Sequence, residues 1–123
     1  MPTNFELASE FMRLNNQDVY SYPSIRDQKT QELRYELIRE ELEELQVAFA
    51  QSDLVQVADA LTDLLYVVYG AGHSFGLDLD ACYREVHRSN MSKLGADGKP
   101  VYREDGKILK GPNYSPPDLV PII

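Results

Sequence analysis

The sequence has only one cysteine and few basic residues, and each of these features excludes a class of structure or partner. The single cysteine, Cys82, excludes an intrachain disulfide, which fits a cytosolic setting and a thiol that serves as a small core residue. Twelve Lys and Arg against twenty Asp and Glu give a net charge of −8. Broad nucleic-acid binding depends on a basic surface, so we expect no nucleic-acid partner.

The chain also has little that resembles a leader or a membrane segment. Residues 1–11 have neither a basic start nor a long apolar run, so we expect no signal peptide. No segment approaches the roughly 20 apolar residues of a membrane helix, so we expect no membrane partner. At 123 residues with 43% hydrophobic content, the chain has the size and composition of one globular domain.

Apolar residues recur at helical intervals over four stretches, which predicts an all-α fold. We expect helices at about 5–15, 27–51 and 53–75, and a fourth that is capped by Asp78 or Asp80 and continues to about Ser92. Only a tight turn separates the second helix from the third, so these two must pack antiparallel, and Gly76 is expected to end the third. The pattern predicts an antiparallel four-helix bundle over residues 1–94.

Residues 95–123 predict a different kind of structure. Asp105-Gly106 between extended residues is a hairpin turn signal, so we expect a short two-stranded ribbon within 99–111. Prolines at 112, 116, 117 and 121 favour an extended tail beyond it. The tail is apolar, which favours packing on the same or a neighbouring subunit. With the apolar third helix, it indicates a homo-oligomer, either a dimer or a tetramer.

Acidic residues gather in the second predicted helix and recur in the third. Glu40, Glu41 and Glu44 are three or four residues apart, so they share one flank of a helix. Asp59 and Asp63 are four apart on the next helix. Carboxylates brought together in a low-dielectric site repel one another, and divalent cations with oxygen ligands remove that conflict. The pattern therefore indicates a metal site.

A Glu-rich helix is more often a solvated face, and we prefer this interpretation for Glu36 and for Glu43, which follows Arg39 by four residues. The third helix is different, because it is apolar nearly all round and should be buried. Buried carboxylates are rarely found without a partner or a metal. Asp63 is therefore the stronger metal candidate and Asp59 the weaker.

Several segments together resemble the all-α nucleoside triphosphate pyrophosphohydrolases, a superfamily that includes MazG, the dimeric dUTPases and phosphoribosyl-ATP pyrophosphohydrolase. The segments are Glu40-Glu41-x-x-Glu44, Asp63-Leu64-Leu65-Tyr66 and Ser89-Asn90-x-Ser92-Lys93. The tail from Asp105 to Tyr114 is similar to the phosphoribosyl-ATP pyrophosphohydrolase-like MazG branch of bacteria and phages. The resemblance implies a cytoplasmic protein, in a bacterial cytosol or that of a phage-infected host.

The resemblance also implies hydrolysis of a nucleoside triphosphate to a nucleoside monophosphate and pyrophosphate. Glu41, Glu44 and Asp63 would bind Mg²⁺, with Mn²⁺ as an alternative ion. Glu40 would be a further ligand or the residue that orients the water and accepts its proton. The family's second motif places an acid three residues before its Asp, whereas this chain has Asp59 four before. Asp59 is therefore either a direct ligand or a neighbour of the cluster.

The resemblance assigns phosphate contacts to four later residues, and Lys93 would stabilise the leaving pyrophosphate. The aromatic residues near the first loop are candidates to stack on a base, either purine or pyrimidine, and a deoxynucleotide is one plausible substrate. His73 and His87 are expected to be structural or peripheral. The substrate-binding candidates are Asn90, Lys93, Lys107, Lys110, Phe11 and Tyr22.

Two other functions stay open. A non-catalytic helical oligomer would bind nucleotides or another protein through its acidic face, without a defined metal stoichiometry. A phosphoribosyl-ATP pyrophosphohydrolase would share the chemistry but act on a different substrate.

Overall fold

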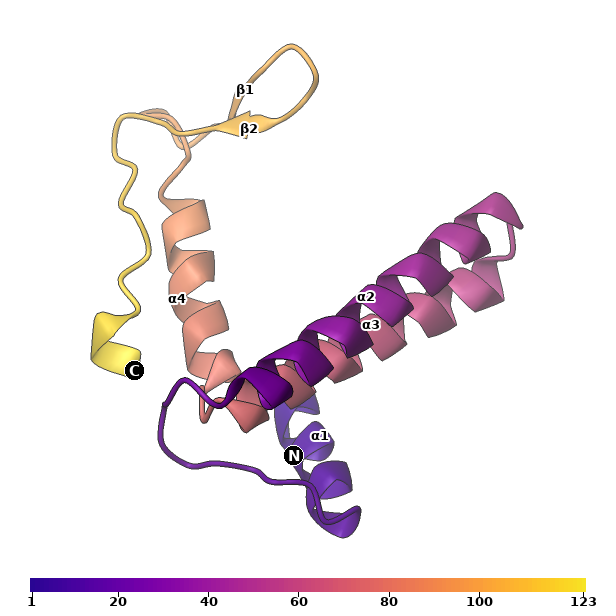
Figure 1. The fold of residues 1–123 in the computed structure, drawn as a ribbon. Coiled ribbons are helices and arrows are strands. Elements are labelled where there is room, and N and C mark those ends of the chain that lie inside the picture. The colour runs from indigo at the N-terminus through magenta and orange to yellow at the C-terminus, as the bar shows by residue number, and fades with distance from the viewer. The chain divides into compact units, whose positions relative to one another are not determined.

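The computed structural model describes all 123 residues and confirms the all-α class (Figure 1). The four helices lie within about two residues of their predicted positions. Val101 pairs with Leu109 across the predicted antiparallel ribbon, and Gly106 adopts a φ of +85° in its turn. The tail is extended except for a turn at residues 112–113 and one short 3-10 helix. The elements are α1 (Asn4–Leu14), α2 (Gln28–Ala50), α3 (Leu54–Ser74), α4 (Leu79–Met91), β1 (Val101–Tyr102), β2 (Ile108–Leu109) and η1 (Val120–Ile122).

The chain consists of two compact units, Met1–Leu79 and Asp80–Ile123. The first contains α1, α2 and α3, and the second contains α4 beyond its first residue, the ribbon and the tail. The boundary that we expected at residue 94 falls inside the second unit, because hydrogen bonds join α4 to the tail.

Side-chain caps determine where the helices of the first unit begin. Thr3 and Glu6 form a capping box at the start of α1. The carboxylate of Asp27 accepts a hydrogen bond from the Thr30 N–H at the start of α2, and Asp53 caps α3 in the same way. The turn before Asp53 is tight, so α2 and α3 run antiparallel and side by side, as predicted (Figure 1).

The end of α3 is a Schellman turn built on Gly76, which adopts a φ of +67°. The Gly76 N–H donates to the carbonyl of His73, and the Leu77 N–H donates to that of Gly72. A Cβ at Gly76 would lie 1.9 Å from the carbonyl oxygen of Tyr22, so only glycine lets the α1–α2 loop pass so closely. This contact fixes the loop against the end of α3.

The core of the first unit is small, and its largest side chains lie where α1 meets α3. The Phe5 ring stacks on the imidazole of His73 at 3.8 Å between ring centroids, and the Nε2 atom of His73 lies 2.7 Å from the Phe5 carbonyl oxygen. His73 is therefore structural, as expected, whereas His87 is exposed. The buried apolar residues of this unit are Phe5, Ala8, Met12, Ala48 and Ala60.

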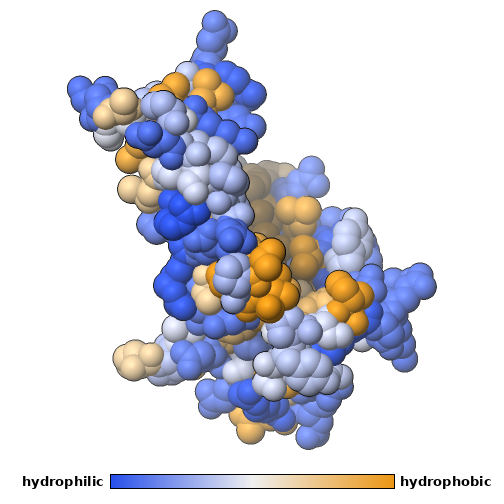
Figure 2. Space-filling view, turned by 90° about the vertical axis from the view of Figure 1, so that its left-hand side faces the viewer, coloured by the Kyte–Doolittle hydropathy of each residue, from blue (hydrophilic) through white to orange (hydrophobic).

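The sequence led us to expect a buried α3, and this expectation is wrong for the single chain. Only 11% of its most apolar 18-residue stretch is buried, because α2 and the short α1 cover only part of it. By length and composition α3 would also suffice to cross a membrane, which corrects our expectation about apolar segments. Core helices of soluble proteins share this property. In Figure 2, orange patches mark apolar residues that are exposed on one face of the molecule.

In the second unit, the tail is held by Ser89 of α4 and by Ser92, which directly follows the end of α4. The Ser89 hydroxyl donates to the carbonyl oxygen of Ser115 at 2.8 Å, and the Ser92 hydroxyl accepts from the Ser115 N–H at 2.9 Å. The Gly111 N–H donates to the carbonyl oxygen of Lys93 at 2.7 Å. The Cys82 thiol is buried and forms no disulfide, as expected. The tail is thus bound to its own chain along α4.

Candidate metal centre

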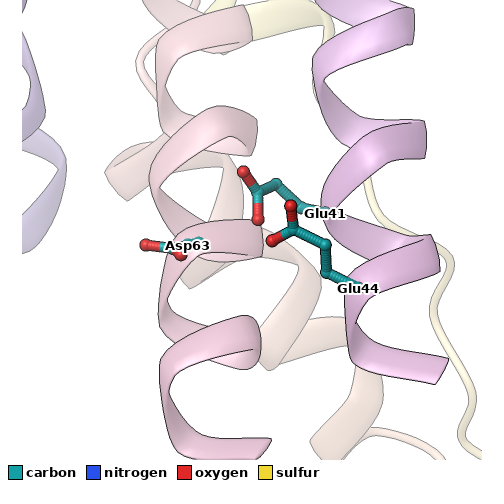
Figure 3. Close-up of side chains that lie close together, drawn as sticks. All are labelled: Glu41, Glu44 and Asp63. Atoms are coloured by element: carbon teal, nitrogen blue, oxygen red, sulfur yellow. The ribbon is translucent and has the colours of Figure 1, made fainter. Parts of the chain in front are cut away.

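Three of the predicted carboxylates meet between α2 and α3. Glu41 and Glu44 are one turn apart on α2 and extend toward α3, which carries Asp63 (Figure 3). One oxygen from each side chain can be chosen so that all three lie within 4.8 Å of one another. Because α2 and α3 are antiparallel neighbours, the spacing along each helix is enough to produce this cluster.

The cluster is electrostatically unfavourable without a cation. Burial raises the pKa of the Glu41 carboxyl, and the charges of Glu44, Asp63 and Glu40 raise it further. Burial likewise raises the pKa of Asp63, followed by repulsion from Asp59 and Glu44. No lysine or arginine forms an ion pair with any of the three clustered carboxylates.

These residues fit a hard divalent cation. Oxygen ligands are those that Mg²⁺ prefers, and a small set of carboxylates leaves coordination positions for water and substrate phosphates. The Oε2 atom of Glu41 is buried and has no hydrogen-bond partner. A buried acceptor without a donor is costly, and a bound cation would remove that cost. The centre can therefore hold a metal ion beside a phosphate chain.

Glu40 and Asp59 lie beside this group but do not join it. Both are exposed and line a cavity of about 490 Å³ that extends along α2 and α3 toward their connecting turn. Both are close enough to raise the pKa of a clustered neighbour, Glu41 and Asp63 respectively. The structure therefore places them as neighbours of the cluster, and their role as direct ligands stays a prediction.

Two further acids of α2, Glu36 and Glu43, are paired with a basic residue. Arg39 forms ion pairs with Glu36 and with Glu43 on the solvated face of the helix. This pairing separates Glu36 and Glu43 from the metal candidates.

A second cavity, of about 120 Å³, lies on the other side of the cluster and includes one of the two predicted base-stacking residues. Phe11 lines it and meets Tyr66 edge to face, with ring centroids 5.7 Å apart. Tyr22 does not line it. Tyr22 is 61% exposed on the α1–α2 loop, and its ring centroid lies 5.3 Å from the guanidinium carbon of Arg26. The predicted role of Tyr22 has no support from this cavity.

The predicted phosphate-binding residues belong to the second unit. Asn90 is exposed in the last turn of α4, and Lys93 lies two residues beyond the end of that helix. Lys107 lies beside the ribbon, and the Nζ atom of Lys110 lies 4.8 Å from the ring centroid of Tyr114. Their contact with a substrate stays a prediction.

The role of the serines in the same motif was missed from the sequence. Ser89 and Ser92 are used by the tail, through Ser115. The spacing of three residues places both serines on one face of α4, but nothing in the sequence shows what that face meets. Part of the motif is therefore structural.

Comparison with known proteins agrees with this geometry. A family model described as phosphoribosyl-ATP pyrophosphohydrolase matches residues 8–90, which include all three clustered carboxylates. An uncharacterized protein of Acanthamoeba polyphaga mimivirus, L479, is 32% identical over 117 residues, which cover 88% of this chain and 42% of the viral protein. The chain thus spans less than half the length of that relative. It belongs to the phosphoribosyl-ATP pyrophosphohydrolase family.

Proposed function

We propose that this member of the phosphoribosyl-ATP pyrophosphohydrolase family hydrolyses a nucleoside triphosphate, with a deoxynucleotide as the favoured candidate, to the monophosphate and pyrophosphate. The observation that carries the proposal is the group of Glu41, Glu44 and Asp63, with oxygens within 4.8 Å and no cation of the chain to neutralise them. Family membership supports pyrophosphohydrolase chemistry, and the choice of substrate is our own step.

Each protein group has a defined task in this proposal. Glu41, Glu44 and Asp63 would hold Mg²⁺, or Mn²⁺ in its place. When bound, the metal would offset the charge of the triphosphate and lower the pKa of the attacking water. Glu40, exposed in the large cavity, would orient that water and accept its proton. Asp59, in the same cavity, would act either as a further metal ligand or as a neighbouring charge that raises the pKa of Asp63.

The residues of the second unit would act on the phosphate chain. Lys93 would stabilise the charge of the departing pyrophosphate, and Asn90 would donate a hydrogen bond to a phosphate oxygen. Lys107 and Lys110 would add positive charge at the same end of the substrate. These four residues would supply donors that the carboxylate cluster itself lacks.

The two cavities suggest how the substrate lies along the helix pair. The small cavity, with Phe11 and Tyr66, suits a base. The large cavity, beyond Glu44, has room for the β- and γ-phosphates. The cluster lies between them, where an α-phosphate would be.

We also propose that the active protein is a homo-oligomer, either a dimer or a tetramer. The exposed apolar side chains of α1 and α3 would be covered by a second copy, because a stable interface of this kind resembles a core cut in two. These side chains include Leu7, Leu61, Leu65 and Val68. Sedimentation of the intact chain as a 14.0 kDa monomer would refute this proposal.

The test of function is product analysis on the full chain with Mg²⁺. Ribo- and deoxynucleoside triphosphates and phosphoribosyl-ATP are each incubated with the protein, and ³¹P NMR identifies the released groups. We expect pyrophosphate and a nucleoside monophosphate. Release of orthophosphate would contradict α–β cleavage, and hydrolysis of phosphoribosyl-ATP alone would assign that substrate instead. Tight nucleotide binding without metal or turnover would favour the non-catalytic interpretation.

A further inference from the structure

Arg34 is a basic residue of α2 that the proposed chemistry does not use. Its Nε atom is buried and has no hydrogen-bond partner, and its guanidinium takes part in no ion pair. The other arginines of the first unit differ: Arg13 donates to Ser9, Arg26 to the carbonyl of Ser74, and Arg39 to Glu36. Burial without a partner is costly for a charged donor, so Arg34 is not explained by the stability of the single chain.

The guanidinium lies at the small cavity. Arg34 lines it together with Phe11, Gln17, Leu37 and Tyr66. Arg34 precedes Glu41 by seven residues, which is two helical turns, so both lie on the same side of α2 and are separated by about 10 Å along its axis. The base end of a nucleotide whose α-phosphate lies at the cluster would therefore reach Arg34.

Gly70 of α3 makes room for this side chain. A Cβ at Gly70 would lie only 2.9 Å from the Nη1 atom of Arg34. Glycine inside a helix costs about 1 kcal/mol relative to alanine, so the open space has an energetic cost. In return, the space lets the Arg34 guanidinium lie beside the cavity, where no group of the protein pairs with it.

We infer that Arg34 reads the base of the substrate and selects a pyrimidine, with cytosine as the best match. The inference rests on the proposed function, since it assumes that a nucleotide binds at the carboxylate cluster. Arg34 would be a specificity-determining residue in contact with the base, while Phe11 and Tyr66 provide aromatic walls.

The size of the cavity favours a single ring. It measures about 120 Å³. A protein cavity of about 150 Å³ holds one benzene ring, so a six-membered pyrimidine suits this space better than a bicyclic purine.

The hydrogen-bonding pattern distinguishes among the pyrimidines. A guanidinium offers parallel N–H donors and no acceptor. Cytosine presents two adjacent acceptors, O2 and N3, and then an amino donor, for which Gln17, which also lines the cavity, has an amide oxygen as acceptor. Uracil and thymine place an N–H between their two carbonyls, and this N–H would face a donor. The donors of Arg34 therefore meet two acceptors on cytosine, but would meet an N–H donor on uracil or thymine.

The test compares three variants of the full chain: Arg34→Met, Gly70→Ala and, as the matched control on the same helix, Arg39→Met. kcat/KM is measured for dCTP, dUTP, dTTP, dATP and dGTP with Mg²⁺, and binding of deoxycytidine and thymidine is followed separately by NMR. We expect dCTP to be the preferred substrate. Arg34→Met should lower kcat/KM for dCTP by about 5- to 100-fold, mainly through KM, with little change for purine nucleotides.

Two further readouts separate base recognition from a structural role. Arg34→Met leaves no protein group unpaired, so its melting temperature should equal or exceed that of the wild type, whereas loss of a structural arginine would lower it. Gly70→Ala displaces only the flexible end of Arg34 and should reduce the dCTP preference without loss of stability. Arg39→Met should keep the preference unchanged.

Failure of this inference is distinct from failure of the proposed function. A wild type that hydrolyses all five nucleotides equally, or an Arg34→Met variant with unchanged selectivity, would overturn the role of Arg34 while leaving the pyrophosphohydrolase proposal intact. If no nucleotide is hydrolysed, deoxycytidine binding that is lost in Arg34→Met still supports base recognition, and equal binding of deoxycytidine and thymidine overturns it.

Discussion

Two sets of carboxylates, one in each unit, have pKa values shifted in opposite directions. In the first unit, Glu41 and Asp63 have raised pKa values because burial and neighbouring acids oppose their charge. In the second, Glu85 accepts hydrogen bonds from Arg88 and from the Asp118 N–H, which lower its pKa to about 2. An acid with donors on its own chain is part of the scaffold. Acids that are grouped without donors need a cation from outside.

The sharpest contrast is in turnover. Glu41→Gln or Asp63→Asn should lower kcat by about 1,000-fold or more, because metal-ion catalysis contributes several kcal/mol and about 1.4 kcal/mol corresponds to a factor of ten. Helicity measured by circular dichroism should stay unchanged. The matched control is Glu36→Gln, an acid of the same helix that is paired with Arg39 and should keep full turnover. Wild-type activity in both cluster variants would show that the cluster is not the metal site.

A second effect is the dependence of stability on metal and pH. Because the pKa values of Glu41 and Asp63 are raised in the folded state, the metal-free protein binds protons more tightly folded than unfolded. Its stability should therefore fall as pH rises through the carboxylate range and up to the raised values. Mg²⁺ at 100 times its Kd should restore about 2.7 kcal/mol near neutral pH and much less near pH 5, where protons compete. Scanning calorimetry at both pH values measures this, and an equal Mg²⁺ effect at both would contradict it.

The scaffold role of the second unit can be tested by deleting residues 111–123. In the truncated chain, Ser89 and Ser92 lose their hydrogen bonds to Ser115. At about 1 kcal/mol for each hydrogen bond, the free energy of unfolding should fall by about 1–3 kcal/mol. Urea denaturation followed by circular dichroism measures the loss, and sedimentation velocity shows whether assembly also weakens. If stability, assembly and turnover were all unchanged, the tail would have no part in the scaffold or the site.

The smallest effect concerns Glu85 itself. Its lowered pKa means that it contributes stability above the ordinary carboxylate range, and that this contribution is lost as pH falls toward about 2. Glu85→Gln should melt at a lower temperature than the wild type at pH 7, with the difference narrowing below pH 4. Mg²⁺ binding should be the same in both proteins. A difference that widens on acidification would reverse the assigned sign.

The helices and the clustered acids were predictable because their determinants are local. Caps such as Thr3, Asp27 and Asp53 mark the helix starts, and spacings of three or four residues place Glu41 and Glu44 on one flank. The tight turn then brings Asp63 opposite them. Asp59 was harder to place, because a residue one turn away on a helix is near the cluster whether or not it belongs to it.

What could not be predicted depends on contacts between distant residues. The lack of a partner for Arg34 becomes visible only when α1, α2 and α3 are packed, since a single arginine in a sequence looks like any surface charge. The use of Ser89 and Ser92 by Ser115 depends on the path of the tail. The exposure of α3 also follows from packing, because hydrophobicity indicates that a surface should be covered but not what covers it.

The central claim, that the cluster is a metal site, is tested most directly by Mn²⁺ titration followed by electron paramagnetic resonance. Free Mn²⁺ gives the signal, so its loss counts bound ions without any need for substrate or turnover. The account predicts saturable binding at a fixed stoichiometry in the wild type and in Glu85→Gln, and its loss in Glu41→Gln and Asp63→Asn. Equal Mn²⁺ binding by the wild type and the two cluster variants would contradict it.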